Sequence, residues 1–75
     1  MMEKEQLTFT LRDGEDFITL QNLLKAENIV ATGGEAKYVI VDGLVTVNGE
    51  CETRRGKKLR SGDVVAFENY EITVE

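Results

Sequence analysis

Residues Leu44 to Arg60 read LVTVNGECETRRGKKLR, and the rest of the chain is organised around this stretch. It begins as an apolar, β-branched segment typical of a strand, and the Asn48-Gly49 pair that follows is a tight-turn signal. Arg54 to Arg60 then holds five basic side chains and no acid, whereas the rest of the chain has four basic and fourteen acidic residues. The net charge is −5 overall and −10 outside that short segment. Such segregation favours an anion-binding patch over a basic turn that is merely solvated.

Length and composition bound the class of protein. The 75 residues suffice for one domain, residues 1–75, and leave no room for a linker and a second core. Apolar residues make up 41% and charged residues 31%, as in soluble globular domains. No apolar run approaches the roughly 18 residues of a membrane span, and the polar N-terminus MMEKEQ does not resemble a secretory signal. We therefore expect a cytoplasmic monomer with no membrane partner.

Residues that carry chemistry are scarce. The chain has no His, which is the commonest general base and metal ligand. A single thiol, Cys51, excludes an internal disulfide, fits a reducing compartment, and cannot by itself build a zinc site or a Cys-His pair. Flanking Glu50 and Glu52 should raise the pKa of that thiol while Arg54 and Arg55 oppose them, so the net effect stays open. We expect a strand role for Cys51, no enzyme activity, and no cofactor or metal.

Two parts of the chain have the period of strands. Residues 7–12, LTFTLR, alternate apolar and polar side chains, with Leu7, Phe9 and Leu11 on one side, and Asp13-Gly14 ends the segment. The C-terminal third suggests a hairpin. The sheet is expected to begin with Val45 and Val47 and to turn at Asn48-Gly49. After a turn at Ser61-Gly62-Asp63, a strand over Val64 to Phe67, a turn at Glu68-Asn69 and a strand over Tyr70 to Val74 should form the hairpin.

The segment between these strands changes to a helical period. Leu20, Leu23 and Leu24 have the i, i+3, i+4 spacing of one buried face, which predicts a helix over residues 20–27. Thr19 is suited to the N-cap, where its hydroxyl can accept a hydrogen bond from a free amide of the first turn. Asn28 is suited to the left-handed residue that ends a helix, so that the next residue packs back on Leu24.

The following segment is ambiguous. Thr32 and Glu35 have the spacing of a capping box, in which each side chain bonds the amide of the other residue. The face of Ala36, Val39 and Ile40 agrees with a helix over residues 35–42, ended by a left-handed Gly43. However, the run YVIV has strand propensity, and Asp42-Gly43 before LVTV also reads as a hairpin turn. The residues alone favour the helix only slightly.

Taken in order, these features resemble a known family. The run TLQNLLKAENIVATGGEAKYVIVDGLVTVNGECETRRGKKLRSGDVVAF, residues 19–67, resembles an S4 domain, the αL RNA-binding motif, and is most similar to short stand-alone bacterial S4 proteins of the YaaA/YbcJ type. A leucine-rich helix, E-A-K, V-N-G, T-R-R and L-x-x-G-D-V-V occur in the family order. The resemblance implies that residues 35–42 are helical. It implies an α+β fold: two short helices packed on a small, mostly antiparallel β-sheet.

The resemblance also implies a function, because S4 domains bind structured RNA, often ribosomal or transfer RNA, in translation or ribosome assembly. They use basic residues of the second helix and of the loop after V-N-G, and RNA helices are recognised largely through phosphates and 2′-hydroxyls. Between Thr32 and Glu35, where many S4 domains carry arginines, this chain has neutral residues and an acid. The candidate RNA-binding side chains are Lys37, Arg54, Arg55, Lys57, Lys58 and Arg60, and the amides of Gly33 and Gly34 are candidate phosphate contacts.

Other interpretations deserve comparison. Small β-grasp sulfur carriers also combine a leucine-rich helix with V-N-G-E and L-x-x-G-D-x-V, but their chemistry needs a flexible Gly-Gly C-terminus, whereas this chain ends EITVE. A non-catalytic relative of those carriers and a protein-interaction module with a basic loop are the two alternatives to RNA binding. For Tyr38 we expect a half-buried packing role in preference to stacking on a base. Which RNA is bound is not readable, since phosphate contacts carry no sequence information.

Overall fold

The structure, a computed structural model, describes residues 4–75, and in that range it contains two helices and seven short strands. The elements are β1 (Glu5–Phe9), β2 (Ile18–Thr19), α1 (Leu20–Ala26), α2 (Gly33–Val41), β3 (Val45–Val47), β4 (Glu50–Cys51), β5 (Lys58–Leu59), β6 (Val64–Phe67) and β7 (Tyr70–Val74). Within residues 4–75, neither helix has the length and apolar character that crossing a lipid bilayer requires.

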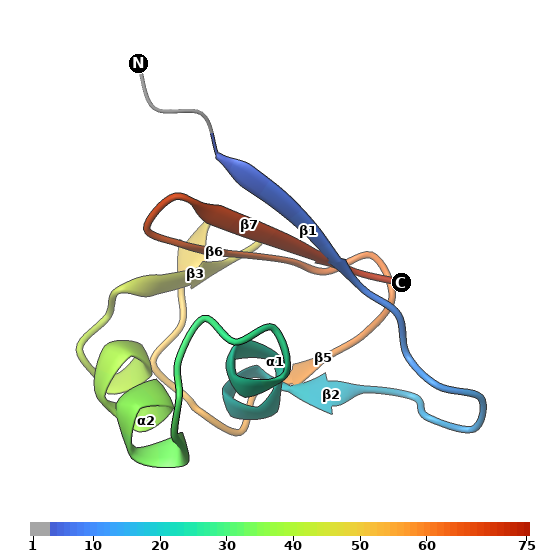
Figure 1. Cartoon of the computed structure of the whole chain (residues 1–75), viewed down its shortest axis with the longest axis horizontal. Helices are drawn as coiled ribbons and strands as arrows, with labels where there is room; N and C mark the ends of the chain where they lie inside the picture. Colours follow the sequence, from blue (N-terminus) through green and yellow to red (C-terminus); the bar gives the residue numbers. More distant parts are fainter. Residues whose placement is uncertain (1–3) are drawn as a thin grey trace.

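The strands form one larger and one smaller sheet. The larger sheet has the order β1-β7-β6-β3-β4, and β2 pairs with β5 separately. Only the β1–β7 pair is parallel, and the other pairs are antiparallel. Figure 1 shows both helices and the β2–β5 pair on the same side of the larger sheet. The predicted α+β class, with two short helices on a mostly antiparallel sheet, is confirmed.

Helix α1 begins and ends as its sequence predicts. The Thr19 hydroxyl accepts a hydrogen bond from the Asn22 amide at 3.4 Å, which makes Thr19 the N-cap. At the other end Asn28 is left-handed, with φ 56°. The amide of Ile29 then donates to the Leu24 carbonyl at 3.0 Å, which is the long hydrogen bond of a Schellman motif. The chain therefore leaves α1 in a sharp turn.

Helix α2 confirms the helical interpretation of the ambiguous segment. The helix forms there because its caps and its buried face outweigh the strand propensity of YVIV. The Glu35 amide donates to the Thr32 hydroxyl at 3.1 Å. The reciprocal bond was predicted wrongly: the Glu35 carboxylate accepts from the Ala31 amide at 3.5 Å and not from Thr32. Gly43 ends the helix with φ 78°, and the Leu44 amide donates to the Val39 carbonyl at 3.1 Å in a second Schellman motif.

The structure confirms two turns that the sequence predicts in the sheet. Asn48 and Gly49 have φ of 52° and 85°, the two positive values that a type I′ turn needs between β3 and β4. Glu68, with φ 53°, lies in the turn that joins β6 to β7. The first strand differs from its predicted range, since β1 covers residues 5–9 and is set by its parallel register with β7. Strands β2 and β5 were not predicted, because a strand of two residues is too short to show an alternation of apolar and polar side chains.

The core lies between the sheet and the helices. Its buried members within residues 4–75 are Leu20, Leu23, Leu24, Val30, Ala36, Val39, Ile40, Val45, Val47, Leu59, Val65, Phe67, Ile72 and Val74. Each helix contributes one face, so the opposite face of α2 is directed outward. Leu59 of β5 is completely buried. It therefore anchors the C-terminal end of the loop that joins β4 to β5.

Candidate nucleic-acid interface

The loop of residues 52–57 between β4 and β5, hereafter the basic loop, is attached to the start of α1 by its backbone. The Leu20 amide donates to the Lys57 carbonyl at 2.9 Å, and the Gln21 amide donates to the Arg55 carbonyl at 3.1 Å. A turn closed by the Lys57 amide on the Arg54 carbonyl, at 3.1 Å, completes the attachment. The loop carbonyls thus satisfy helix-end amides that have no partner inside the helix. A segment that reads as a flexible basic turn is therefore held in place.

Gln21 also brings the second helix to this loop. A Cβ added at Gly33 would come within 3.0 Å of the Gln21 Nε2 atom, so the first turns of α1 and α2 touch at this point. Lys37 lies one turn beyond Gly33 on the same face of α2, and its side chain is exposed. Figure 1 shows the segment after β4 descending from the sheet to the two helices. Lys37 and the basic loop therefore belong to neighbouring parts of one surface.

Arg54 is not a free cation. Its Nε atom donates to Glu52 Oε2 at 2.9 Å, its Nη2 atom donates to Oε1 at 3.1 Å, and its amide donates to Oε2 at 3.1 Å. The side-chain bonds from Arg54 lower the pKa of the Glu52 carboxyl from 4.5 to about 2, although partial burial acts in the opposite direction. The Arg54 side chain remains 72% exposed. Glu52 therefore orients Arg54 and neutralises part of the positive charge of the loop.

Sequence reasoning missed Glu52 as a member of the site. The available signal was the spacing E-T-R: in an extended segment, residues i and i+2 point to the same side, so Glu52 and Arg54 could have been paired. Sequence reasoning treated the acid only as a neighbour of Cys51. In the structure Cys51 is an exposed residue of β4 whose Sγ atom lies 3.5 Å from the Gly43 carbonyl oxygen.

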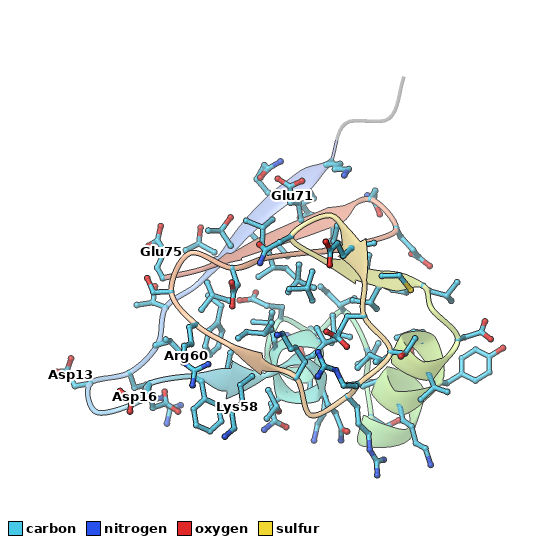
Figure 2. All side chains as sticks on the ribbon, turned by 180° about the vertical axis from the view of Figure 1, so that it is seen from behind. Asp13, Asp16, Lys58, Arg60, Glu71 and Glu75 are labelled. Carbon is cyan, nitrogen blue, oxygen red and sulfur yellow. The ribbon has the colours of Figure 1, made fainter. Side chains whose placement is uncertain are left out.

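Lys58 and Arg60 follow the basic loop, and their surroundings differ from those of Arg54. The Lys58 Nζ atom is 4.9 Å from the centre of the Phe17 ring, and the antiparallel pairing of β5 with β2 brings them together. In the view of Figure 2, Lys58, Arg60 and Asp16 lie on the same side of the molecule. The Arg60 amide bonds Asp63 Oδ2 at 2.8 Å and lowers the pKa of that carboxyl. The five-residue basic cluster of the sequence is therefore divided between two environments.

The N-terminus of α2 holds the two candidate glycines. Gly33 is half-buried against Gln21, whereas Gly34 is exposed, with only the Thr32 hydroxyl within 4 Å of an added Cβ, at 3.9 Å. The Glu35 carboxylate lies at the same helix end, on the Ala31 amide. Its negative charge opposes a phosphate there. Helix α2 thus offers Lys37 as its main anion contact, with the glycine amides secondary.

Tyr38 differs from its expectation. The sequence suggested a half-buried packing role, but the side chain is 68% exposed, because the face of Ala36, Val39 and Ile40 is the one turned to the core. Val41, one turn further along, is 57% exposed. These two apolar side chains lie on the outward face of α2 with Lys37.

The fold and this surface define a class: a small α+β domain whose two consecutive helices are joined to a sheet by a loop rich in arginine and lysine. A family model for the S4 domain matches residues 9–75, a range that contains the whole resemblance noted in residues 19–67. The chain belongs to the S4 domain family.

Two relatives, one of them also with a solved structure, support this assignment. The chain is 42% identical over 55 residues to a probable ribosome maturation protein, RlbA, of Bacillus subtilis (strain 168), covering 73% of this chain and 78% of that protein. It is 37% identical over 57 residues to a putative RNA-binding protein, YbcJ, of Escherichia coli (strain K12), covering 76% and 81%. The solution structure of E. coli YbcJ, described as having an αL motif involved in RNA binding, aligns with a TM-score of 0.69 and 34% identity over 95% of this chain and 89% of that one.

Proposed function

We propose that this protein is a non-catalytic, cytoplasmic RNA-binding protein that acts as a monomer. Its ligand is structured RNA, ribosomal or transfer RNA, and the relatives named for RNA binding and ribosome maturation support a role on a ribosomal particle. The observation that carries the proposal is the attachment of the basic loop to α1. Those bonds fix the backbone that carries Arg54, Arg55 and Lys57 on a protein whose net charge is −5. Preorganised cations of this kind bind phosphates without reading the base sequence.

The contacts have an order of importance. Arg55 and Lys57 of the basic loop and Lys37 of α2 come first, and Arg54 joins them by exchanging part of its pairing with Glu52 for a phosphate, onto which Arg can fork with two hydrogen bonds. Lys58 and Arg60 follow the basic loop at the margin of the site, and the Lys58 ammonium lies over the Phe17 ring.

The test is a double substitution, Arg54→Gln with Arg55→Gln. Glutamine is preferred to glutamate because a new acid at position 54 would repel Glu52. RNA affinity at about 100 mM salt should fall at least tenfold, since two phosphate contacts are lost. The thermal midpoint should change little, because exposed ion pairs contribute little to stability. Binding is measured by titrating labelled ribosomal RNA fragments.

A matched control is Lys4→Gln with Arg12→Gln, which removes the same charge at the two ends of β1 and should leave the affinity within about twofold. Equal losses in both double variants would show attraction by overall charge only. No binding by the wild type at low salt would assign the basic loop to a protein partner instead.

A further inference from the structure

The outward face of α2 has an apolar strip that the core does not use. Tyr38 and Val41, separated by one helical turn, are the exposed apolar residues of this helix, at 68% and 57%. Single exposed apolar side chains are ordinary on soluble proteins, but neighbouring ones rimmed by polar residues mark ligand-binding grooves. The strip is therefore a candidate binding surface.

The strip is the floor of an open groove of about 430 Å³ lined by Gly34, Lys37, Tyr38, Val41 and Asp42. Sites for small ligands have volumes of about 300–1,000 Å³. Gly34 lies one turn before Tyr38 on the same helical face, and it has no side chain that could cover the phenol ring. One flat side of the ring is thus accessible to a planar group.

The charges around the groove indicate which ligand fits. Lys37 lies toward the N-terminal end of α2, which packs on Gln21, and Asp42 caps the C-terminal end, so a phosphate is favoured on the Lys37 side. Gly33, packed against Gln21, connects this end of the groove to the carbonyl of Arg55 in the loop. A nucleic-acid strand whose phosphates follow the basic loop and Lys37 would deliver its next base to Tyr38.

A protein partner fits the groove less well. A stable protein interface covers about 800 Å² on each side, which is about a sixth of the 4940 Å² exposed by the protein. Two apolar side chains between a lysine and an aspartate are far smaller than that. Single bases, in contrast, stack on single aromatic rings.

We propose that Tyr38 is a stacking platform for one unpaired base, with Val41 against the edge of that base and Lys37 on its adjacent phosphate. This inference rests on the proposed function and narrows its ligand. The RNA is a structured RNA with a single-stranded nucleotide next to its paired region, such as a bulge, loop or overhang, and not an uninterrupted duplex.

The experiment compares two RNAs: a blunt duplex of about 16 base pairs and the same duplex with a short single-stranded adenosine tail. Stacking of one base on an aromatic ring contributes about 1–3 kcal/mol, so the tailed RNA should bind wild-type protein roughly five- to a hundredfold more tightly. Tyr38→Phe should keep that preference, because the ring remains. Tyr38→Ala should abolish it without changing affinity for the blunt duplex.

Leu44→Ala is the matched control, since Leu44 is an apolar residue that is 50% exposed and does not line the groove. It should keep the preference for the tail. A second readout is Tyr38→Trp: the chain has no other Trp, so fluorescence reports position 38 alone. The tailed RNA should quench it and the blunt duplex should not.

The outcomes separate this inference from the proposed function. If both RNAs bind equally well to the wild type and both depend on Arg54 and Arg55, RNA binding stands and the stacking role of Tyr38 is overturned. An equal loss for both RNAs in Tyr38→Ala, or equal quenching of Tyr38→Trp, overturns it as well. If neither RNA binds at all, the proposed function fails and the stacking role fails with it.

Discussion

At the scale of single residues, the carboxylate of Glu52 sets how much positive charge the basic loop presents. It accepts three hydrogen bonds from Arg54 and has its pKa lowered to about 2, so it is ionised at any physiological pH. A phosphate that approaches Arg54 must share the guanidinium with an acid that is already in place. Arg55 and Lys57 carry their charge without such a partner among the ion pairs of residues 4–75.

Glu52→Gln should alter the pH dependence of stability. Because the pKa of Glu52 is lower in the folded protein than its ordinary 4.5, its stabilising effect is present above pH 4.5 and is lost as pH falls toward about 2. The difference in unfolding free energy between wild type and Glu52→Gln should therefore be largest at neutral pH and shrink on acidification. Urea unfolding at several pH values measures it.

Glu50→Gln serves as the control for this experiment, because it removes an equal charge on β4 and leaves the hydrogen bonds of Arg54 intact. Its difference from the wild type should be small at every pH. A Glu52→Gln difference that stays constant down to acidic pH would contradict the assigned pairing. We also expect Glu52→Gln to bind RNA severalfold more tightly, since one negative charge near the phosphates is gone.

Single neutralisations test how the basic cluster is divided. Arg55→Gln should weaken RNA binding roughly five- to eightfold at about 100 mM salt, the value of one phosphate contact. Lys58→Gln should change affinity less than twofold, because its ammonium lies over the Phe17 ring at 4.9 Å, away from the basic loop. Filter binding with one RNA measures both. Equal losses would extend the interface across β5.

At the scale of elements, the two helices end in the same way. Asn28 and Gly43 are both left-handed, and each is followed by a residue whose amide bonds back to the last turn. These endings turn the chain from α1 toward α2 and from α2 toward the sheet. They place the N-terminus of α2 on Gln21 and leave Lys37 and Tyr38 outside.

Opposite effects are expected for alanine at the two ends of α2. Gly43→Ala should destabilise the protein by about 1–2 kcal/mol, because φ at this position is left-handed and an added Cβ would lie 3.4 Å from Cys51 Sγ. Gly34→Ala should stabilise it by about 0.4–1 kcal/mol, since alanine suits the helical backbone here and has fewer unfolded conformations than glycine. Each effect corresponds to several degrees in Tm, about 4–8 °C per kcal/mol.

Thermal unfolding followed by circular dichroism measures both variants. Destabilisation by Gly34→Ala would mean that α2 begins later than Gly33. No loss in Gly43→Ala would contradict the left-handed end of the helix.

At the scale of the whole molecule, an acidic protein with a basic loop should bind RNA selectively and in a salt-dependent way. The acids outside the loop repel RNA that does not match the site, while salt screens the attraction of the loop. Figure 2 shows Asp13, Asp16, Glu71 and Glu75 on the side of the molecule toward β1 and the segment before β2. That side should face away from the bound RNA.

Four phosphate contacts, from Lys37, Arg54, Arg55 and Lys57, imply a slope of roughly −2.8 to −3.6 for log affinity against log salt. Between about 50 and 200 mM salt, affinity should fall roughly 50- to 150-fold. Titrations at four or five salt concentrations measure the slope. A slope near −1 would show that most of these cations do not touch phosphate, and a slope much steeper than −4 would bring Lys58 and Arg60 into the interface.

The local features of this protein were determined by its sequence, because their hydrogen bonds join residues only a few positions apart. Thr19, Asn28, Thr32 and Gly43 mark the ends of the helices, and the Asn48-Gly49 turn marks a hairpin. Residue preferences alone barely decided the helical state of YVIV, since its β-branched residues suit either structure.

Only the tertiary structure decided what depends on distant residues and on side-chain direction. The parallel β1–β7 pair and the β2–β5 pair join segments far apart in the chain, and the second of these brings Lys58 to the Phe17 ring. Tyr38 is exposed because the opposite face of α2 packs in the core. The Arg54 guanidinium is partly occupied because the Glu52 side chain points toward it. Amino-acid composition and hydrophobic periodicity predict none of these features, because they contain no information on which surfaces of the folded chain meet.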